Sequence, residues 1–296
     1  MCVAALGSQT GGSTIRPAAF CGVVGFKPTY GRISRYGVIP RAWSMDHVGI
    51  ISRKVEDSAI MLEALAGFDK KDPTTLVKPV PEYSKKLNLG ETPHIALFPD
   101  FYVREAHAEI KNNIKTVLDQ LVKEGAKISE LPLPRYFSIV KAAQSIIGTT
   151  ECAAYHENMF MTNKMDYRPK IRGLIASGLI TPASTYLKAQ RIRNYFTRHL
   201  GELVKKYDCI ITPSSVTPPL HGLDNTGSSA FNSPWSFCGF PAITIPSGLT
   251  ENGLPMGIQL VSSPYMEEKL LRIAHWCEKI LDFNNTPKLI SLKEND

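Results

Sequence analysis

The spacing of apolar and polar residues divides the chain into predicted helices and strands. Helical spacing of apolar residues predicts helices over residues 56–68, 110–121, roughly 136–160, 188–206 and 267–281. Short apolar or alternating runs predict strands at residues 94–98, 127–131, 209–212, 242–245 and 256–261. Because strands and helices interleave, we expect an α/β fold with a single mixed, mostly parallel central sheet covered by helices.

The two remaining stretches indicate how the chain is organised. Residues 1–36 are rich in glycine and hydroxyl side chains and are predicted to be mostly loop, and residues 72–93 carry four prolines and many lysines, which is typical of a surface connection. Apolar strands lie at both ends of the region and have no separate partners. We therefore expect a single domain over residues 1–296.

Charge and composition limit the choice of partners. The chain has 296 residues, of which 43% are hydrophobic, and a formal net charge of +7. Its densest basic stretch, residues 188–206, places the cations around an apolar helical stripe that includes Ile192, Phe196 and Leu200. This pattern indicates a solvated helix face rather than a nucleic-acid footprint, although a weak tRNA contact stays open.

The six cysteines are isolated, with no CxxC pair and no histidine at zinc spacing, so we predict free thiols, a reducing compartment and no metal. No apolar stretch is long enough to span a bilayer, and the first residues lack the layout of a secretory signal. We expect a cytoplasmic protein that does not bind a membrane.

A glycine-rich run, residues 7–14 (GSQTGGST), has three interpretations. It fits the frame of a phosphate-binding loop, but Ser13 stands where that loop needs lysine, and Pro17 disfavours a long helix beginning here. It also fits an ordinary turn. The third interpretation is a nucleophile loop, in which Ser13 sits on a tight backbone and successive N–H groups meet a developing oxyanion. Gly11 and Gly12 permit that geometry because they carry no side chain.

Longer motifs favour the third interpretation. The segment TGGSTIRPAAFCGVVGFKPTYGRISRYGV resembles the signature of the amidase signature family, which comprises serine hydrolases and amidotransferase subunits that cleave carboxylic amides. PRAWSMDHVGIISRKVEDSAIMLEALAGFDKKDPTT, DCIITPSSVTPP and NSPWSFCGFPAITIPSGLTENGLPMGIQLVS are similar to later parts of the same family. The resemblance covers nearly the whole chain, and residues 100–200 contribute least to it.

The resemblance implies a function for several residues. Ser13 aligns with the acylated serine, and Thr10, Gly11 and Gly12 align with the backbone donors of the oxyanion hole. Gln9 stands where the family often has Asp, and Arg16 stands one place later than in the commoner GGSxR motif. Both departures adjoin the pocket, so they leave the substrate class open. The implied substrate is a small linear carboxylic amide, and the chemistry needs no cofactor.

The family resembled here activates its nucleophile with a lysine that acts through a second serine, and both precede the nucleophile. Only twelve residues precede Ser13. We therefore expect this sequence to be an N-terminally truncated fragment with little or no amidase activity alone. Two alternatives remain open: an amidotransferase subunit that works with partner subunits on a tRNA-linked substrate, and a non-catalytic remnant.

Other candidate residues have simpler explanations. Lys27 lies within the resembled motif and is interpreted as structural, and no histidine lies in a motif. Asn232, Trp235 and Phe237 are candidates for lining a pocket, with core packing as the alternative. Core packing is favoured for Phe237, while the two interpretations of Trp235 stand even.

Overall fold

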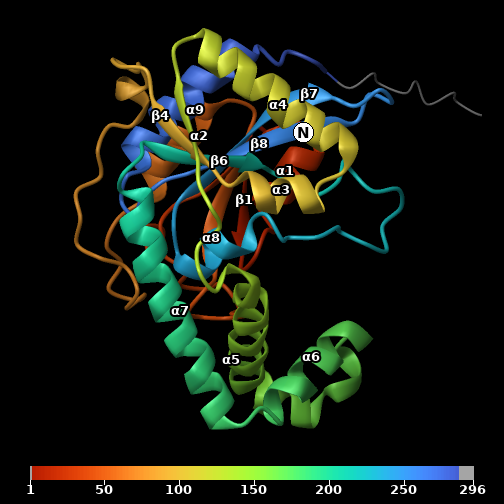
Figure 1. Ribbon diagram of the computed structural model, residues 1–296. Helices are drawn as coiled ribbons and strands as arrows, with labels where there is room; N and C mark the ends of the chain where they lie inside the picture. The colour runs from red at the N-terminus through yellow and green to blue at the C-terminus, as the bar shows by residue number, and fades with distance from the viewer. Residues whose placement is uncertain (1, 287–296) are drawn as a thin grey trace, which may run out of the picture.

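A computed structural model describes residues 2–286 (Figure 1). All eight of the described strands belong to one sheet, in the order β1-β3-β2-β7-β8-β6-β4-β5. Their bounds are β1 Ala4–Gln9, β2 Val24–Lys27, β3 His47–Ser52, β4 His94–Leu97, β5 Lys127–Glu130, β6 Cys209–Pro213, β7 Ala242–Leu249 and β8 Pro255–Val261. The prediction of an α/β fold with one mixed sheet is confirmed.

The directions of the strands differ from the prediction of a mostly parallel sheet. Of the seven strand pairings, five are antiparallel and only β4–β5 and β4–β6 are parallel. Parallel neighbours need a long crossover such as a helix, whereas β7 and β8 are joined by the short turn 250–254 and must run antiparallel. The helix-rich stretch 94–131 supplies the one β4–β5 crossover that the pattern predicted correctly.

Three helices pack on one another along the sheet. They are α2 (Val55–Leu65), α9 (Glu267–Leu281) and α4 (Ala108–Lys123), with α9 in contact with both of the others. The short helix α1 (Ile15–Phe20) lies against β2, β7 and β8. The side chains that these elements bury form one continuous apolar core. Two further helices, α3 (Pro99–Glu105) and α8 (Ser233–Cys238), and the 3-10 turns Ser84–Lys86 and Phe137–Ile139 lie in the connections.

A group of helices extends from the sheet, and we call residues 140–204 the helical arm. It contains α5 (Val140–Thr162), α6 (Pro169–Leu179) and α7 (Ala183–Val204), with a 3-10 turn at Lys164–Asp166. Figure 1 shows α5 and α7 descending beside α8, and α6 packed at the outer end of α5. Within the arm, Cys152, Ala153, Phe160 and Ile175 form a small apolar cluster separate from the main core.

Long periodic segments were predicted accurately, whereas the elements within residues 1–36 were not. Helix α9 has the predicted bounds, and α2, α4, α5 and α7 match predicted helices within a few residues. The stretch predicted as mostly loop contains β1, α1 and β2. Pro17 does not prevent α1, because a residue in the first helical turn has no intrahelical N–H bond to lose. The helix is nevertheless only six residues long.

Candidate active site

Ser13 lies in the tight turn between β1 and α1. Its side chain is exposed, and none of the described residues hydrogen-bonds to its hydroxyl. The turn begins where β1 leaves the sheet, opposite His47 at the start of β3. Ser13 is therefore held at the end of a strand pair and remains open to a reactant.

The side chain of Gln9 holds both ends of this turn. Its Oε1 accepts the backbone N–H groups of Thr14 and Ile15 at 2.8 and 2.9 Å, and its Nε2 donates to Ser236 Oγ at 2.9 Å. Thr14 and Ile15 open α1, where backbone N–H groups lack intrahelical acceptors. Gln9 thus supplies the acceptor that a carboxylate at this position would also supply, which accounts for a glutamine being compatible with the motif.

Several backbone amides of the turn remain free. No described residue accepts a hydrogen bond from the N–H of Gly11, Gly12 or Ser13. The carbonyl groups, by contrast, are occupied: Gly11 O accepts Ser236 Oγ at 2.6 Å and Gly12 O accepts the N–H of Arg16 at 3.0 Å. Unpaired N–H groups beside a serine are the arrangement that an oxyanion hole requires.

Gly12 is required by a close approach. A Cβ built on Gly12 would lie 2.6 Å from Asn232 Oδ1, whereas one on Gly11 would meet nothing nearer than 3.4 Å. Neither glycine has a positive φ, so the conformational freedom expected of them is not used. Asn232 is itself fully buried, with Nδ2 donating to Ser214 O and Gln259 Oε1. The backbone of Gly12 is therefore packed against a fixed side chain.

The loop preceding β3 supports the other side of the turn. Asp46 accepts the Thr10 hydroxyl at 2.5 Å and the N–H groups of Arg41 and Ala42 at 2.8 and 2.7 Å. The guanidinium of Arg193, from α7, donates to Ser44 and to the Phe237 carbonyl. Burial lowers the pKa of Arg193 from its ordinary value. These contacts join the arm, α8 and the turn in one polar network.

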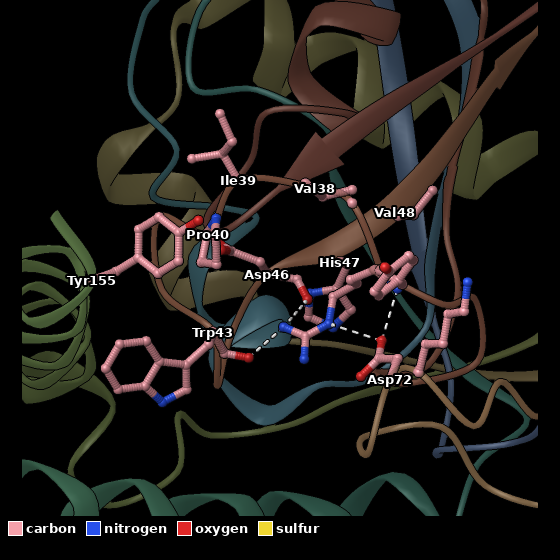
Figure 2. A pocket seen from close by; sticks show the side chains of 13 residues that line it. Val38, Ile39, Pro40, Trp43, Asp46, His47, Val48, Asp72 and Tyr155 are labelled. Atoms are coloured by element: carbon pink, nitrogen blue, oxygen red, sulfur yellow. Dashed lines mark hydrogen bonds and ion pairs between the residues drawn. The ribbon is translucent and has the colours of Figure 1, made fainter. Parts of the chain in front are cut away.

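A cavity of about 340 Å³ lies beside the turn. Figure 2 shows Trp43 and Tyr155 together on one side of it and Asp72 on the other. Asp46 and His47 belong to its wall, and these two residues contact Thr10 and Gln9. Ser13 does not line it. Its remaining lining residues are Arg35, Tyr36, Gly37, Val38, Ile39, Pro40, Val48 and Lys71, so the walls are largely apolar and aromatic.

Comparisons with known proteins identify the family of this chain. Residues 1–271 match the family described as Amidase. The chain belongs to the amidase family. Its curated relatives include A subunits of glutamyl-tRNA(Gln) amidotransferase. The subunit from Ehrlichia canis is 35% identical over 94% of this chain, and the subunit from Clostridium novyi is 36% identical over 94% of it. The chain spans about 64% of the length of each.

Solved structures of other amidase-family proteins are similar throughout the chain. The A subunit of glutamyl-tRNA(Gln) amidotransferase from Thermotoga maritima has a TM-score of 0.78 at 30% identity, over 94% of this chain and 62% of that one. The peptide amidase from Stenotrophomonas maltophilia has a TM-score of 0.78 at 26% identity, over 97% of this chain and 64% of that one. The family and fold that the motifs indicated are therefore confirmed.

Two titratable groups of this amidase-family chain are buried near the turn but do not contact Ser13. Lys27 is fully buried and donates to the carbonyls of Phe240 and Pro28, and burial lowers its pKa to about 7. His47 contacts Gln9 O at 3.3 Å, and burial lowers its pKa well below the usual value. Both residues hold the backbone, which agrees with a structural role for Lys27.

The structure separates the other candidate residues. Trp235 and Phe237 are both 0% exposed, and the indole of Trp235 donates to Phe231 O, so both belong to the core. Asn232 contacts the turn itself. The Arg16 guanidinium is largely buried, and its side chain donates a hydrogen bond to Thr226 Oγ1 at 3.2 Å. No described carboxylate lies within 4.0 Å of it, and burial lowers its pKa.

Sequence reasoning missed Gln144, Ser236 and Asp46. Gln144 contacts Thr10 across 134 positions, and Ser236 contacts Gly11 across 225. A polar residue within an apolar helical stretch was the only local signal for Gln144.

No group of three or more potential metal ligands gathers anywhere in residues 2–286. Within the same residues, no helix combines the length and apolarity that crossing a membrane requires.

Proposed function

We propose that this protein is an amide hydrolase in which Ser13 is the acylated nucleophile. The observation that carries the proposal is the exposed Ser13 hydroxyl beside the free amides of Gly11 and Gly12, within a family of amidases. Thr10, the third predicted donor, also has a backbone N–H without an acceptor among the described residues, and its side chain is bonded to Asp46. The Ser13 N–H is a further donor without an acceptor among the described residues.

The reaction has two steps. Ser13 Oγ attacks the amide carbonyl and passes its proton to a base, and the carbonyl oxygen becomes an oxyanion that accepts the N–H groups of Gly11 and Gly12. When the carbonyl re-forms, the C–N bond breaks and the nitrogen leaves with a proton. Water then attacks the ester, which releases a carboxylic acid and restores Ser13. Loss of one oxyanion donor typically slows such reactions about 10²–10³-fold.

The base is supplied, in this proposal, by polypeptide outside the described residues. None of the titratable groups in residues 2–286 hydrogen-bonds to Ser13, and a serine hydroxyl needs a base within about 3.2 Å. Lys27 has a suitable pKa, but its Nζ is buried on two backbone carbonyls. The isolated chain should therefore turn over amides slowly or not at all.

The experiment uses a fluorophosphonate probe and mass spectrometry. The chain is incubated with the probe alone and together with the N-terminal third of a full-length relative, supplied in trans. We expect a phosphonyl adduct on Ser13, formed faster in the presence of the added segment, and none in a Ser13→Ala variant. An adduct elsewhere, or no adduct under either condition, would exclude the proposed nucleophile and favour a non-catalytic remnant.

An amidotransferase subunit is the second candidate. It is favoured by relatives at 35–36% identity that are named as the A subunit of glutamyl-tRNA(Gln) amidotransferase. In that case, Ser13 would release ammonia for a tRNA-linked substrate that other subunits hold. Co-purification with partner subunits and turnover that depends on ATP and tRNA would support it, whereas hydrolysis of simple amides without either would favour a free amidase.

A further inference from the structure

The turn that carries Ser13 is held by two side chains from distant parts of the chain. Gln144, on α5, donates from Nε2 to the Thr10 carbonyl at 3.1 Å and lies 3.5 Å from the Ser233 carbonyl. Ser236, on α8, donates from its hydroxyl to the Gly11 carbonyl at 2.6 Å. The carbonyl oxygens of two consecutive peptide groups of the turn are thus hydrogen-bonded to side chains from other elements.

Because the peptide group is rigid, these contacts also orient its N–H group. A trans peptide is planar, and its C=O and N–H point in opposite directions. Fixing the Thr10 carbonyl therefore fixes the direction of the Gly11 N–H, and fixing the Gly11 carbonyl fixes that of the Gly12 N–H. These are the two N–H groups that lack an acceptor among the described residues.

We propose that Gln144 and Ser236 are positioning residues for the oxyanion-binding amides, Gln144 for the Gly11 N–H and Ser236 for the Gly12 N–H. This inference rests on the proposed function, because it assigns a role within the same site. Without such restraints a glycine-rich turn samples several backbone conformations, since glycine has the least restricted φ of any residue. Donors that must reorient during the reaction stabilise an oxyanion less than donors already in place.

Both positioning residues are themselves fixed. Gln144 is flanked on α5 by Ala143 and Ile147, which are buried in the main core. Ser236 is fully buried and accepts the Gln9 amide while it donates to Gly11. A glutamine amide suits the first position because it has two N–H donors, whereas an ionised glutamate has none for the Thr10 carbonyl.

Nuclear magnetic resonance can follow the two amides separately. Hydrogen exchange and ¹⁵N chemical shifts of Gly11 and Gly12 are measured in the native chain and in Gln144→Leu and Ser236→Ala. We expect Gln144→Leu to change Gly11 more than Gly12 and Ser236→Ala to do the reverse. The matched control is Gln190→Leu, which removes a glutamine bonded to Tyr186 elsewhere in the arm and should change neither amide.

Fluorophosphonate labelling then tests whether the orientation of these amides affects the reactivity of Ser13. Under conditions in which native Ser13 reacts, Gln144→Leu is expected to slow fluorophosphonate labelling about 10- to 100-fold, less than complete loss of a donor would. In Gln144→Glu, the ratio of variant to native rate should rise as the pH falls, because a protonated carboxyl can donate to Thr10 O. A merely structural role would not produce this rescue.

The two proposals fail in different ways. Equal changes at Gly11 and Gly12 in both variants, or no change in either, would overturn the positioning role even if Ser13 is labelled. If native Ser13 is never labelled, the proposed function fails, while the amide measurements still decide whether Gln144 and Ser236 set the turn. Circular dichroism establishes that each variant is folded.

Discussion

The helical arm and the rest of the described molecule, residues 2–139 and 205–286, which we call the body, are stabilised by different interactions. The body buries several polar side chains in hydrogen-bonded networks: Gln9, Lys27 and Gln259 are nearly or fully buried and hydrogen-bonded. The outer part of the arm, between Glu151 and the start of α7, relies on a small apolar cluster and leaves Met165 and Ile180 78% and 82% exposed. A buried polar network fixes one backbone geometry because each lost partner is costly, whereas apolar packing tolerates adjustment.

That difference teaches where the site's geometry originates. The turn after β1 is fixed by hydrogen bonds to the side chains of Gln9, Asp46, Gln144 and Ser236, which come from four separate elements or loops. The arm contributes only its inner end to this network, through Gln144 and Arg193. We therefore expect the outer part of the arm, which includes α6, to be separable from the chemistry proposed for Ser13.

The largest effect is expected at Lys27 in the body. Burial depresses its pKa from 10.5 to about 7 in the folded state, so between those values the unfolded chain binds more protons. Stability therefore rises with pH in this window. Relative to Lys27→Met, the free energy of unfolding of the native protein should increase by roughly 2–3 kcal/mol between pH 7 and pH 9. Urea unfolding across that range measures it.

The sign can be checked at the ends of the window. Below pH 7, Lys27 is protonated in both states and the cost of burying its charge is constant. Above pH 10.5 it is neutral in both states and that cost is gone. If the difference in the free energy of unfolding between the native protein and Lys27→Met does not vary from pH 7 to pH 9, Lys27 is solvated. The body would then not bury this charge, and it would differ less from the arm than we infer.

A core substitution in the arm should affect stability but not chemistry. Ile175→Ala removes a fully buried side chain from the cluster with Phe160 and is expected to destabilise the arm by about 2–3 kcal/mol, at the low end because a small cluster can partly collapse. Hydrogen exchange should increase in α6 and the outer half of α5. The labelling rate of Ser13 should change less than threefold, and a larger change would show that body and arm are coupled.

The two glycines of the turn form a matched pair. Gly12→Ala places a methyl group 2.6 Å from Asn232 Oδ1, so it should cost about 1–3 kcal/mol of stability and slow Ser13 labelling severely. Gly11→Ala meets only ordinary contacts at 3.4 Å or more and should cost less than half as much. Chemical unfolding and probe labelling measure both. Equal effects would mean that conformational freedom, rather than close approach, selects glycine here.

The smallest effect is expected on the surface of the arm. Ile180→Ser replaces a side chain that is 82% exposed and should change the free energy of unfolding by less than about 0.5 kcal/mol. Thermal unfolding of the two proteins measures the difference. A loss of more than about 1 kcal/mol would show that this part of the arm is covered by a partner or by other residues of the protein.

The sequence predicts the arm's long helices and the family more easily than it predicts the site. Apolar stripes such as Ile192, Phe196 and Leu200 have a period that identifies α7 directly. The motif around Ser13 identified the family, but β1, α1 and β2 were missed because short, glycine-rich elements have little periodicity. The contacts of Gln144 and Ser236 with the turn join residues at least 134 positions apart, and no local pattern reports such a pairing.

The direction of the strands was the other failure, for a related reason. Alternating strands and helices in residues 94–131 correctly predict the parallel pair β4–β5. Elsewhere, the connections between β1, β2 and β3 are compatible with either direction, and the antiparallel pairing is decided by tertiary packing. Local sequence therefore identifies these elements only where periodicity is strong, and their pairing only where a crossover or short turn constrains it.

The most direct test of the account is a crystal structure of the chain after reaction with a fluorophosphonate. We expect a phosphonyl ester on Ser13 Oγ, with one phosphoryl oxygen about 2.7–3.1 Å from the amide nitrogens of both Gly11 and Gly12. A phosphoryl oxygen that faces solvent while those two amides bind other groups would contradict the central claim that this turn holds an oxyanion.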